Sequence, residues 1–235
     1  VKSGPSERRK FLDIELSQME RLYLYQLTNY NKILVQRNNL LKQIRFQNNL
    51  IETLEAWDIQ LVKYGSEVIK YREKFIKHLG EVCQKIHNKL TGGKEKILLE
   101  YDRDVGYDSY LTELAKKRQK DLKYSTTTVG PHRDDISFIV NGIDIRKYGS
   151  QGQQRTAALS LKLAQIQLMR EVMKESPILL LDDVLSELDS NRKTYLLESI
   201  KDTQTIITCT GLDEFISKHL PIQRMSVSYT HLRAH

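Results

Sequence analysis

The sequence predicts an α/β protein into which an antiparallel pair of long helices is inserted, and three observations support this class. Two apolar stripes with helical spacing run through residues 16–47 and 57–90. Alternating apolar residues around Asn141-Gly142 indicate a β-hairpin. The continuous apolar run 178–181 indicates a buried parallel strand.

The two stripes predict long helices that pack against each other along one seam. In the first, seven of nine positions spaced near 3.5 residues are apolar or aromatic. The second stripe is unbroken, so we expect an antiparallel pair, each helix about 50 Å long at ~1.5 Å per residue. The turn should fall near Asn48-Asn49. Base stacking is the alternative interpretation of the tyrosines, but the helical period favours core packing.

Shorter elements should follow the helical pair. Thr91-Gly92-Gly93 is expected to end the second helix. Residues 97–101 predict a short strand and 108–122 another helix. Asn141-Gly142 is a strong two-residue hairpin signal, and this hairpin leads directly into a polar loop, which it would hold in place.

That polar loop, Gly149-Ser150-Gln151-Gly152-Gln153-Gln154-Arg155, comes just before a strong helix-forming segment. Small and glycyl residues there leave backbone N–H groups free at a helix N-terminus, which attracts phosphate. Gly152 lets the backbone approach a ligand without a Cβ clash. A simple N-cap by Ser150 is the alternative.

Two acids, Asp182 and Asp183, follow the apolar strand at its carboxyl end, where ligands bind in open α/β sheets. Adjacent carboxylates repel each other unless a cation or hydrogen-bond donors offset the repulsion. Mg²⁺ is the natural partner because it prefers carboxylate and phosphate oxygens. The alternative is an ordinary turn at the end of the strand.

The order of these pieces resembles the signature loop, Walker B strand and D-loop of ABC-type ATPase heads. Longer blocks resemble the RecF family of bacterial DNA replication and repair proteins. They are GPSERRKFLD at 4–13, TVGPHRDD at 128–135, SQGQQR at 150–155 and LDDVLSELD at 181–189. The resemblance covers about residues 1–224. It implies the C-terminal part of an ABC-type P-loop ATPase head with an inserted antiparallel helical arm.

The resemblance also implies roles for residues in these blocks. The signature loop, which touches the γ-phosphate of ATP held by the opposite subunit, consists of Ser150, Gln151, Gly152 and Gln153. Asp182 would orient Mg²⁺ through water. Asp183 would be the catalytic base or position the attacking water; ABC heads in general place Glu there, whereas the RecF pattern has Asp, as here.

Two further positions follow from the same resemblance. Asp189 matches the D-loop acid at a dimer interface. Thr210 falls near the switch position, where ABC transporters carry His.

No Gly-x-x-x-x-Gly-Lys followed by Ser or Thr occurs in the chain; the nearest string, Gly92-Gly93-Lys94, fails because residue 88 is Asn. Residue 1 is Val. We therefore expect the C-terminal portion of a longer protein, with its phosphate-cradling loop upstream, and no ATP hydrolysis by this chain alone. The expected divisions are a remnant of the N-terminal lobe at 1–15, the helical arm at 16–122, the head at 123–225 and translated read-through at 226–235.

Bulk properties set the class of partner and compartment. The 235 residues carry a net charge of +7, which favours a polyanionic partner. Cys83 and Cys209 are too few and too far apart for a disulfide framework, so we expect reduced core residues in a cytoplasmic protein. No apolar run is long enough to span a membrane.

Basic residues cluster in two places that could neutralise phosphates. The candidate DNA-binding residues are Arg8, Arg9, Lys10, Lys116, Lys117 and Arg118. A solvated surface is the alternative for both clusters. His132 and Arg133 follow a Gly-Pro turn and either contact nucleotide or DNA or brace the loop; bracing is favoured.

The resemblance implies ATP-controlled DNA binding in recombinational repair of gapped or stalled replication DNA. The implied cofactors are ATP and Mg²⁺, and the implied partners are single- and double-stranded DNA, RecR with RecO, and a second copy of the chain. One alternative is another SMC or Rad50-like head, which would need a longer coiled coil. The other is a non-catalytic helical scaffold with degenerate head motifs.

Overall fold

The computed structural model describes residues 4–174 and 176–208, and the chain forms two compact units, Val1–Met173 and Lys174–His235. The sequence motifs predicted a domain boundary after residue 122, between the helical arm and the head. By compactness, the signature-loop segment belongs to the same unit as the arm.

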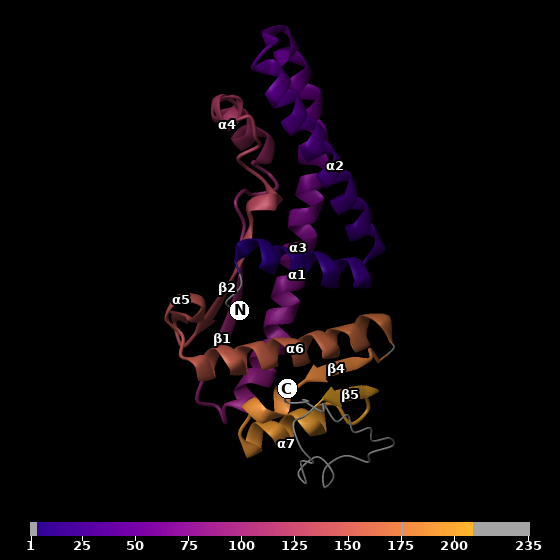
Figure 1. Cartoon of the computed structure of the whole chain (residues 1–235), viewed down its shortest axis with the longest axis vertical. Helices are drawn as coiled ribbons and strands as arrows, with labels where there is room; N and C mark the ends of the chain where they lie inside the picture. The colour runs from indigo at the N-terminus through magenta and orange to yellow at the C-terminus, as the bar shows by residue number, and fades with distance from the viewer. Residues whose placement is uncertain (1–3, 175, 209–235) are drawn as a thin grey trace, which may run out of the picture. The chain divides into compact units, whose positions relative to one another are not determined.

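Three helices and one turn build the arm of the first unit. They are α1 (Pro5–Met19), α2 (Arg21–Ile44), the 3-10 helix η1 (Asn48–Thr53) and α3 (Leu54–Leu90). Figure 1 shows α2 and α3 side by side along the arm. The predicted antiparallel pair is therefore confirmed, with its connection at residues 45–53.

The prediction of one helix over residues 16–47 is wrong at its start. The helix is interrupted at Glu20, whose backbone is extended (φ −137°, ψ 102°) and whose carboxylate caps α2 by accepting from the N–H of Leu22 at 3.3 Å. The apolar period runs through this break, because Leu16 and Tyr23 are both buried. The apolar periodicity therefore gave no sign of the bend at Glu20, which allows α1 to pack on the sheet.

The first unit also holds a three-stranded antiparallel sheet in the order β1-β2-β3. Its strands are β1 (Ile97–Asp102), β2 (Asp135–Val140) and β3 (Ile143–Asp144); α4 (Tyr110–Tyr124) and the 3-10 helix η2 (Pro131–Arg133) lie between β1 and β2. Asn141 and Gly142 have φ of 48° and 82°, as a two-residue type I′ hairpin requires. The predicted hairpin is confirmed.

A short helix, α5 (Ile145–Tyr148), leads from this hairpin to α6 (Gln151–Met173). α6 packs on α3, and α3 also packs on β1, so one long helix connects the arm, the sheet and the signature segment. His87 on α3 contacts Ser160 on α6 at 2.9 Å. Cys83, fully buried on α3, is a free thiol as expected.

The second unit contains β4 (Leu179–Asp182), the 3-10 helix η3 (Val184–Glu187), α7 (Ser190–Ser199) and β5 (Thr205–Thr208). β4 and β5 pair in parallel, from Leu179 opposite Thr205 to Asp182 opposite Thr208. The expected parallel strand is confirmed, but its burial is not. Leu179 and Leu181 are buried, whereas Leu180 is 68% exposed, because alternate side chains face opposite sides of a sheet that is covered on one side among the described residues.

Within the described ranges, none of the helices combines the length and the apolar character that a membrane span requires.

Candidate functional site

The start of α6 is held in shape by a reciprocal pair of hydrogen bonds. The N–H of Gln153 donates to Ser150 Oγ at 3.2 Å, and the N–H of Ser150 donates to Gln153 Oε1 at 3.1 Å. This is a capping box, which satisfies two backbone donors at once. The N-cap alternative for Ser150 is thus part of the geometry.

Capping does not use every donor at this end. The N–H groups of Gln151 and Gly152 occupy the first two helical positions, which precede the first possible intrahelical bond. Both residues are exposed. The loop therefore keeps the donors and the positive end of the helix dipole that suit a phosphate.

Gln154 anchors this loop to the preceding chain. Its side-chain amide donates to the carbonyl of Ile145 at 2.8 Å and to that of Gly149 at 3.1 Å. The hairpin and α5 thus fix the position of the helix start, as the sequence suggested.

The second candidate region is the carboxyl end of β4, in the other compact unit. The hydroxyl of Thr208 donates to Asp182 Oδ1 at 2.5 Å and accepts from the N–H of Asp183 at 3.1 Å. The N–H of Asp183 also reaches the carbonyl of Thr208, again at 3.1 Å. Thr208 therefore orients both acids, a role that sequence reasoning missed because threonine is an ordinary strand residue.

Asp183 has a left-handed backbone (φ 49°, ψ 21°). This region is disfavoured for residues other than glycine, although aspartate tolerates it better than most. Such conformations concentrate at functional sites. Asp182 and Asp183 are both exposed at the sheet edge.

The two acids fit a magnesium ion held mainly by phosphates and water. Mg²⁺ commonly takes one or two carboxylates and keeps several water ligands. Over residues 4–174 and 176–208, no three His, Cys, Asp or Glu side chains form a larger metal-binding cluster. The expected mode of magnesium binding needs no such cluster.

Asp189 caps α7. Its carboxylate accepts from the N–H of Arg192 at 3.0 Å and pairs with the Arg192 guanidinium at 3.2 Å. Its side chain is 56% exposed, so it remains accessible to a partner. Thr210, Cys209 and the segment 226–235 lie outside the described residues.

The N-terminal basic cluster divides into different environments. Arg8 forms a bidentate ion pair with Asp135 at 2.6 and 2.7 Å, and Arg9 donates to the carbonyl of Asp134 at 2.8 Å. Lys10 is exposed. The charge of Arg8 is therefore paired within the chain, whereas Lys10 is exposed to solvent.

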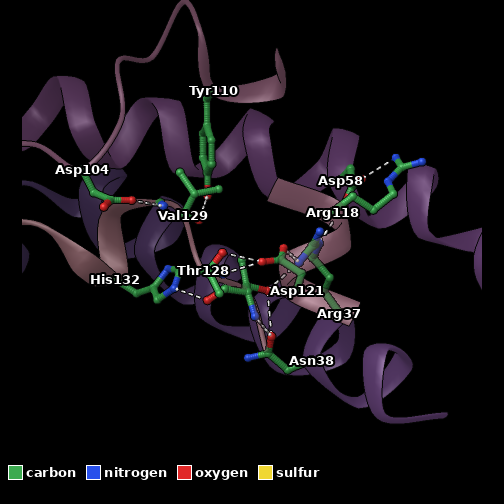
Figure 2. Close-up of polar contacts among 12 residues, drawn as sticks. Arg37, Asn38, Asp58, Asp104, Tyr110, Arg118, Asp121, Thr128, Val129 and His132 are labelled. Carbon is green, nitrogen blue, oxygen red and sulfur yellow. Dashed lines mark hydrogen bonds and ion pairs between the residues drawn. The ribbon is translucent and has the colours of Figure 1, made fainter. Parts of the chain in front are cut away.

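The second cluster divides in the same way. Lys116 is exposed and pairs with Glu113 at 2.7 Å, and Lys117 is half-buried. Arg118 instead binds the buried Asp58 at 2.9 Å. Figure 2 shows this pair beside Arg37.

Arg37 is the centre of a buried polar network, which sequence reasoning missed. Its guanidinium donates to Asp58 at 2.7 Å, and to Asp121 and Thr127 at 2.8 Å each (Figure 2). The residue is fully buried. Its only sequence signal was that it interrupts the apolar stripe of α2.

His132 braces the loop before β2, as favoured from the sequence. Its Nε2 lies 3.0 Å from the carbonyl of Thr127, which can only accept, so Nε2 carries the proton. In the neutral ring Nδ1 then accepts from the hydroxyl of Tyr30 at 2.6 Å. Burial lowers the pKa of His132, and the nearby cations Arg133 and Arg9 lower it further. The hydrogen bond to the carbonyl of Thr127 acts in the opposite direction and raises this pKa.

A scan against protein-family models finds no match for this chain. Curated relatives are clear. The DNA replication and repair protein RecF of Agathobacter rectalis is 55% identical over 225 residues, which is 96% of this chain and 62% of the relative. RecF of Lachnospira eligens is 56% identical over 227 residues with the same coverage. The chain thus spans 62% of the length of these relatives.

Solved structures agree with the sequence relatives. The recombination mediator protein RecF with ATP, described in the RecFOR pathway, gives a TM-score of 0.84 at 40% identity over 91% of this chain and 59% of that one. An Smc head domain from Pyrococcus furiosus gives 0.50 at 15% identity, over 93% of this chain and 54% of that one, which shows the fold alone. The predicted class, part of an ABC-type ATPase head, is confirmed. The far higher identity to RecF proteins decides between the two kinds of head, and this chain belongs to the RecF family.

Proposed function

We propose that a protein of the relatives' full length carrying these residues is an ATP-controlled DNA-binding protein of recombinational repair. ATP would join two copies, each presenting the start of α6 to the nucleotide held by the other. Single- and double-stranded DNA, and RecR with RecO, are the proposed partners. The RecF–ATP structure and the net charge of +7 support this assignment.

The observation that carries the proposal is the exposed, pre-shaped start of α6. A Cβ on Gly152 would meet only Ser150 Oγ, at 3.9 Å. Packing within the described chain therefore does not require glycine here. Close approach of a phosphate to the backbone would require it.

The acids of β4 supply the complementary chemistry. With magnesium-bound ATP present, the metal would polarise the phosphate oxygens and neutralise their charge. Thr208 holds one oxygen of Asp182 and leaves the other for the aqueous side. Asp183, placed next to it, would orient or deprotonate the attacking water.

The test is ATP-dependent dimerisation of Ser150→Arg in the full-length context. The bulky side chain should block closure of a packed interface, while a nucleotide held elsewhere in the same subunit still binds. We expect near-normal ATP binding together with loss of dimerisation and hydrolysis, measured by sedimentation with a non-hydrolysable analogue. Ser109→Arg, at the exposed start of α4, is the matched control and should dimerise normally.

Dimerisation of Ser150→Arg at the wild-type level would reduce the loop to a helix cap and favour the non-catalytic scaffold. A second measurement concerns this chain alone: residues 1–225 should show no ATP hydrolysis. Robust Mg²⁺-dependent turnover by that chain would overturn the division of the site between this segment and a phosphate-cradling loop.

A further inference from the structure

A cavity of about 440 Å³ lies in the first unit, between α1 and α2, and neither the start of α6 nor the acids of β4 line it. One face of α1 lines it through residues that include Ser6, Arg9 and Lys10. α2 contributes Tyr30 and Asn31 on the other side. Its size falls within the range of small-ligand sites, roughly 300–1,000 Å³.

The floor of the cavity consists of buried groups that already form hydrogen bonds within the chain. Arg72 is buried and donates to Asp13 at 2.7 Å, to the carbonyl of Pro131 at 2.7 Å and to Asp134 at 3.3 Å. His132 uses both ring nitrogens, on Tyr30 and Thr127. These groups shape the cavity, and most of their polar capacity is already used within the chain.

The rim differs, because it carries uncompensated positive charge. Arg9 uses one nitrogen on a backbone carbonyl and forms no ion pair among the described residues. Lys10 has no hydrogen-bond or ion-pair partner in that part of the chain. Asp13 is the one acid in the lining, and it is already paired with Arg72. The hydroxyl of Ser6 and the amide of Asn31 add neutral donors.

We propose that this cavity binds a phosphate group, with Arg9 and Lys10 as the charged ligands and Ser6 and Asn31 as neutral donors. The phosphate belongs either to a DNA backbone or to a small phosphorylated molecule. Only the first source rests on the proposed DNA-binding function. The assignment also separates Arg9 and Lys10 from Arg8, whose charge is used by Asp135.

The test uses the 235-residue chain and two probes: inorganic phosphate followed by calorimetry, and a labelled single-stranded oligonucleotide followed by anisotropy. Lys10→Gln removes a cation without breaking a contact within the described chain, so folding should be preserved. It should weaken phosphate binding about tenfold or more, the usual effect of losing one charged hydrogen-bond partner. Lys85→Gln, exposed on α3 and outside the cavity, is the charge-matched control and should change nothing.

A plugging variant separates the cavity from a general surface charge effect. Asn31→Trp keeps every cation but fills the space, and it should abolish phosphate binding. If the source is DNA, the oligonucleotide competes with phosphate, and Lys10→Gln lowers the salt slope of DNA binding by about 1. If the source is a small phosphorylated molecule, phosphate binding is weakened in Lys10→Gln and abolished in Asn31→Trp, while oligonucleotide binding is unchanged; this too supports the site.

Unchanged phosphate affinity in Lys10→Gln and Asn31→Trp, or an equal loss in Lys85→Gln, would overturn the site. ATP-dependent dimerisation through Ser150 would remain standing in that case, since its test measures a different region.

Discussion

Asp134-Asp135 and Asp182-Asp183 are the same dipeptide in two different environments, the first buried or half-buried and the second exposed. Asp134 is fully buried, and its carboxylate accepts from Arg72, Tyr101 and the N–H of Asp104. Burial raises the pKa of Asp134, and these three donors oppose the rise. Asp135 lies beside it, paired with Arg8 and Arg146.

The second pair is exposed, and its hydrogen bonds to Thr208 orient it without enclosing it. A buried carboxylate needs partners inside the chain, because leaving it without them costs several kcal/mol. An exposed pair at the end of a parallel strand has no such requirement. The comparison separates acids that stabilise the fold from acids available to a ligand. The criterion is whether groups of the chain enclose the carboxylate oxygens and donate hydrogen bonds to them, which the sequence alone does not show.

The largest expected effect tests the exposed pair. Asp183→Asn should leave ATP binding intact in the full-length context and slow hydrolysis ~10²–10⁴-fold, because the amide keeps the shape but cannot accept a proton. The free energy of unfolding of this chain should change by less than about 0.5 kcal/mol. Single-turnover hydrolysis and urea denaturation measure the two effects. Unchanged turnover would remove Asp183 from catalysis.

The next effect tests the buried pair. Arg72→Met leaves Asp134 buried without its cation and should lower the free energy of unfolding by about 3–5 kcal/mol. Arg103→Met breaks an exposed pair with Glu73, 3.2 Å long, and should cost less than about 1 kcal/mol. Urea denaturation followed by circular dichroism compares the two. Equal losses would mean that burial does not distinguish these pairs.

The same contrast shows what the sequence could predict. Local signals were sufficient for the hairpin at Asn141-Gly142 and for the strand ending at Asp182, because turn chemistry and apolar runs are encoded by neighbours. The break at Glu20 was missed because the buried stripe continues through it. The networks of Arg37 and Arg72 were missed because their partners come from distant segments.

The site divides along the same line. The residue types of the signature segment and of Asp182-Asp183 follow from their motifs. The role of Thr208 does not, because it depends on β5 lying beside β4. Likewise, the string Arg8-Arg9-Lys10 does not indicate that Arg8 is paired with Asp135 or that Lys10 is exposed.

A smaller effect compares the two glycines of the signature segment, Gly149 and Gly152. A Cβ on Gly149 would lie 2.6 Å from Ile145 Cβ and 2.7 Å from its carbonyl oxygen, so Gly149→Ala should cost about 1–3 kcal/mol. A Cβ on Gly152 would lie 3.9 Å from Ser150 Oγ, an ordinary contact, so Gly152→Ala within α6 should be neutral or stabilising by up to about 1 kcal/mol.

In the full-length context the order should reverse for ATP-dependent dimerisation. Gly152→Ala should impair it more, because its backbone is the one proposed to approach a phosphate. If both variants lose the same stability and dimerise equally, glycine at 152 has no ligand-related role. Thermal denaturation and sedimentation supply the two measurements.

The smallest effect concerns His132, which lies beside the buried pair. Its pKa is lowered in the folded state from an ordinary value near 6.5, chiefly by burial, so the unfolded chain binds more protons over the intervening pH window. The free energy of unfolding should therefore rise with pH across that window. The contribution of His132 is fully present above a pH of about 6.5 and is lost as the pH falls toward the pKa of the folded state. His132→Asn should flatten this slope, measured as urea midpoints between pH 5 and 8. The exposed variant His78→Gln should leave it in place. If the urea midpoint of His132→Asn keeps the full dependence on pH, protonation of His132 is not the cause of the lower stability at low pH.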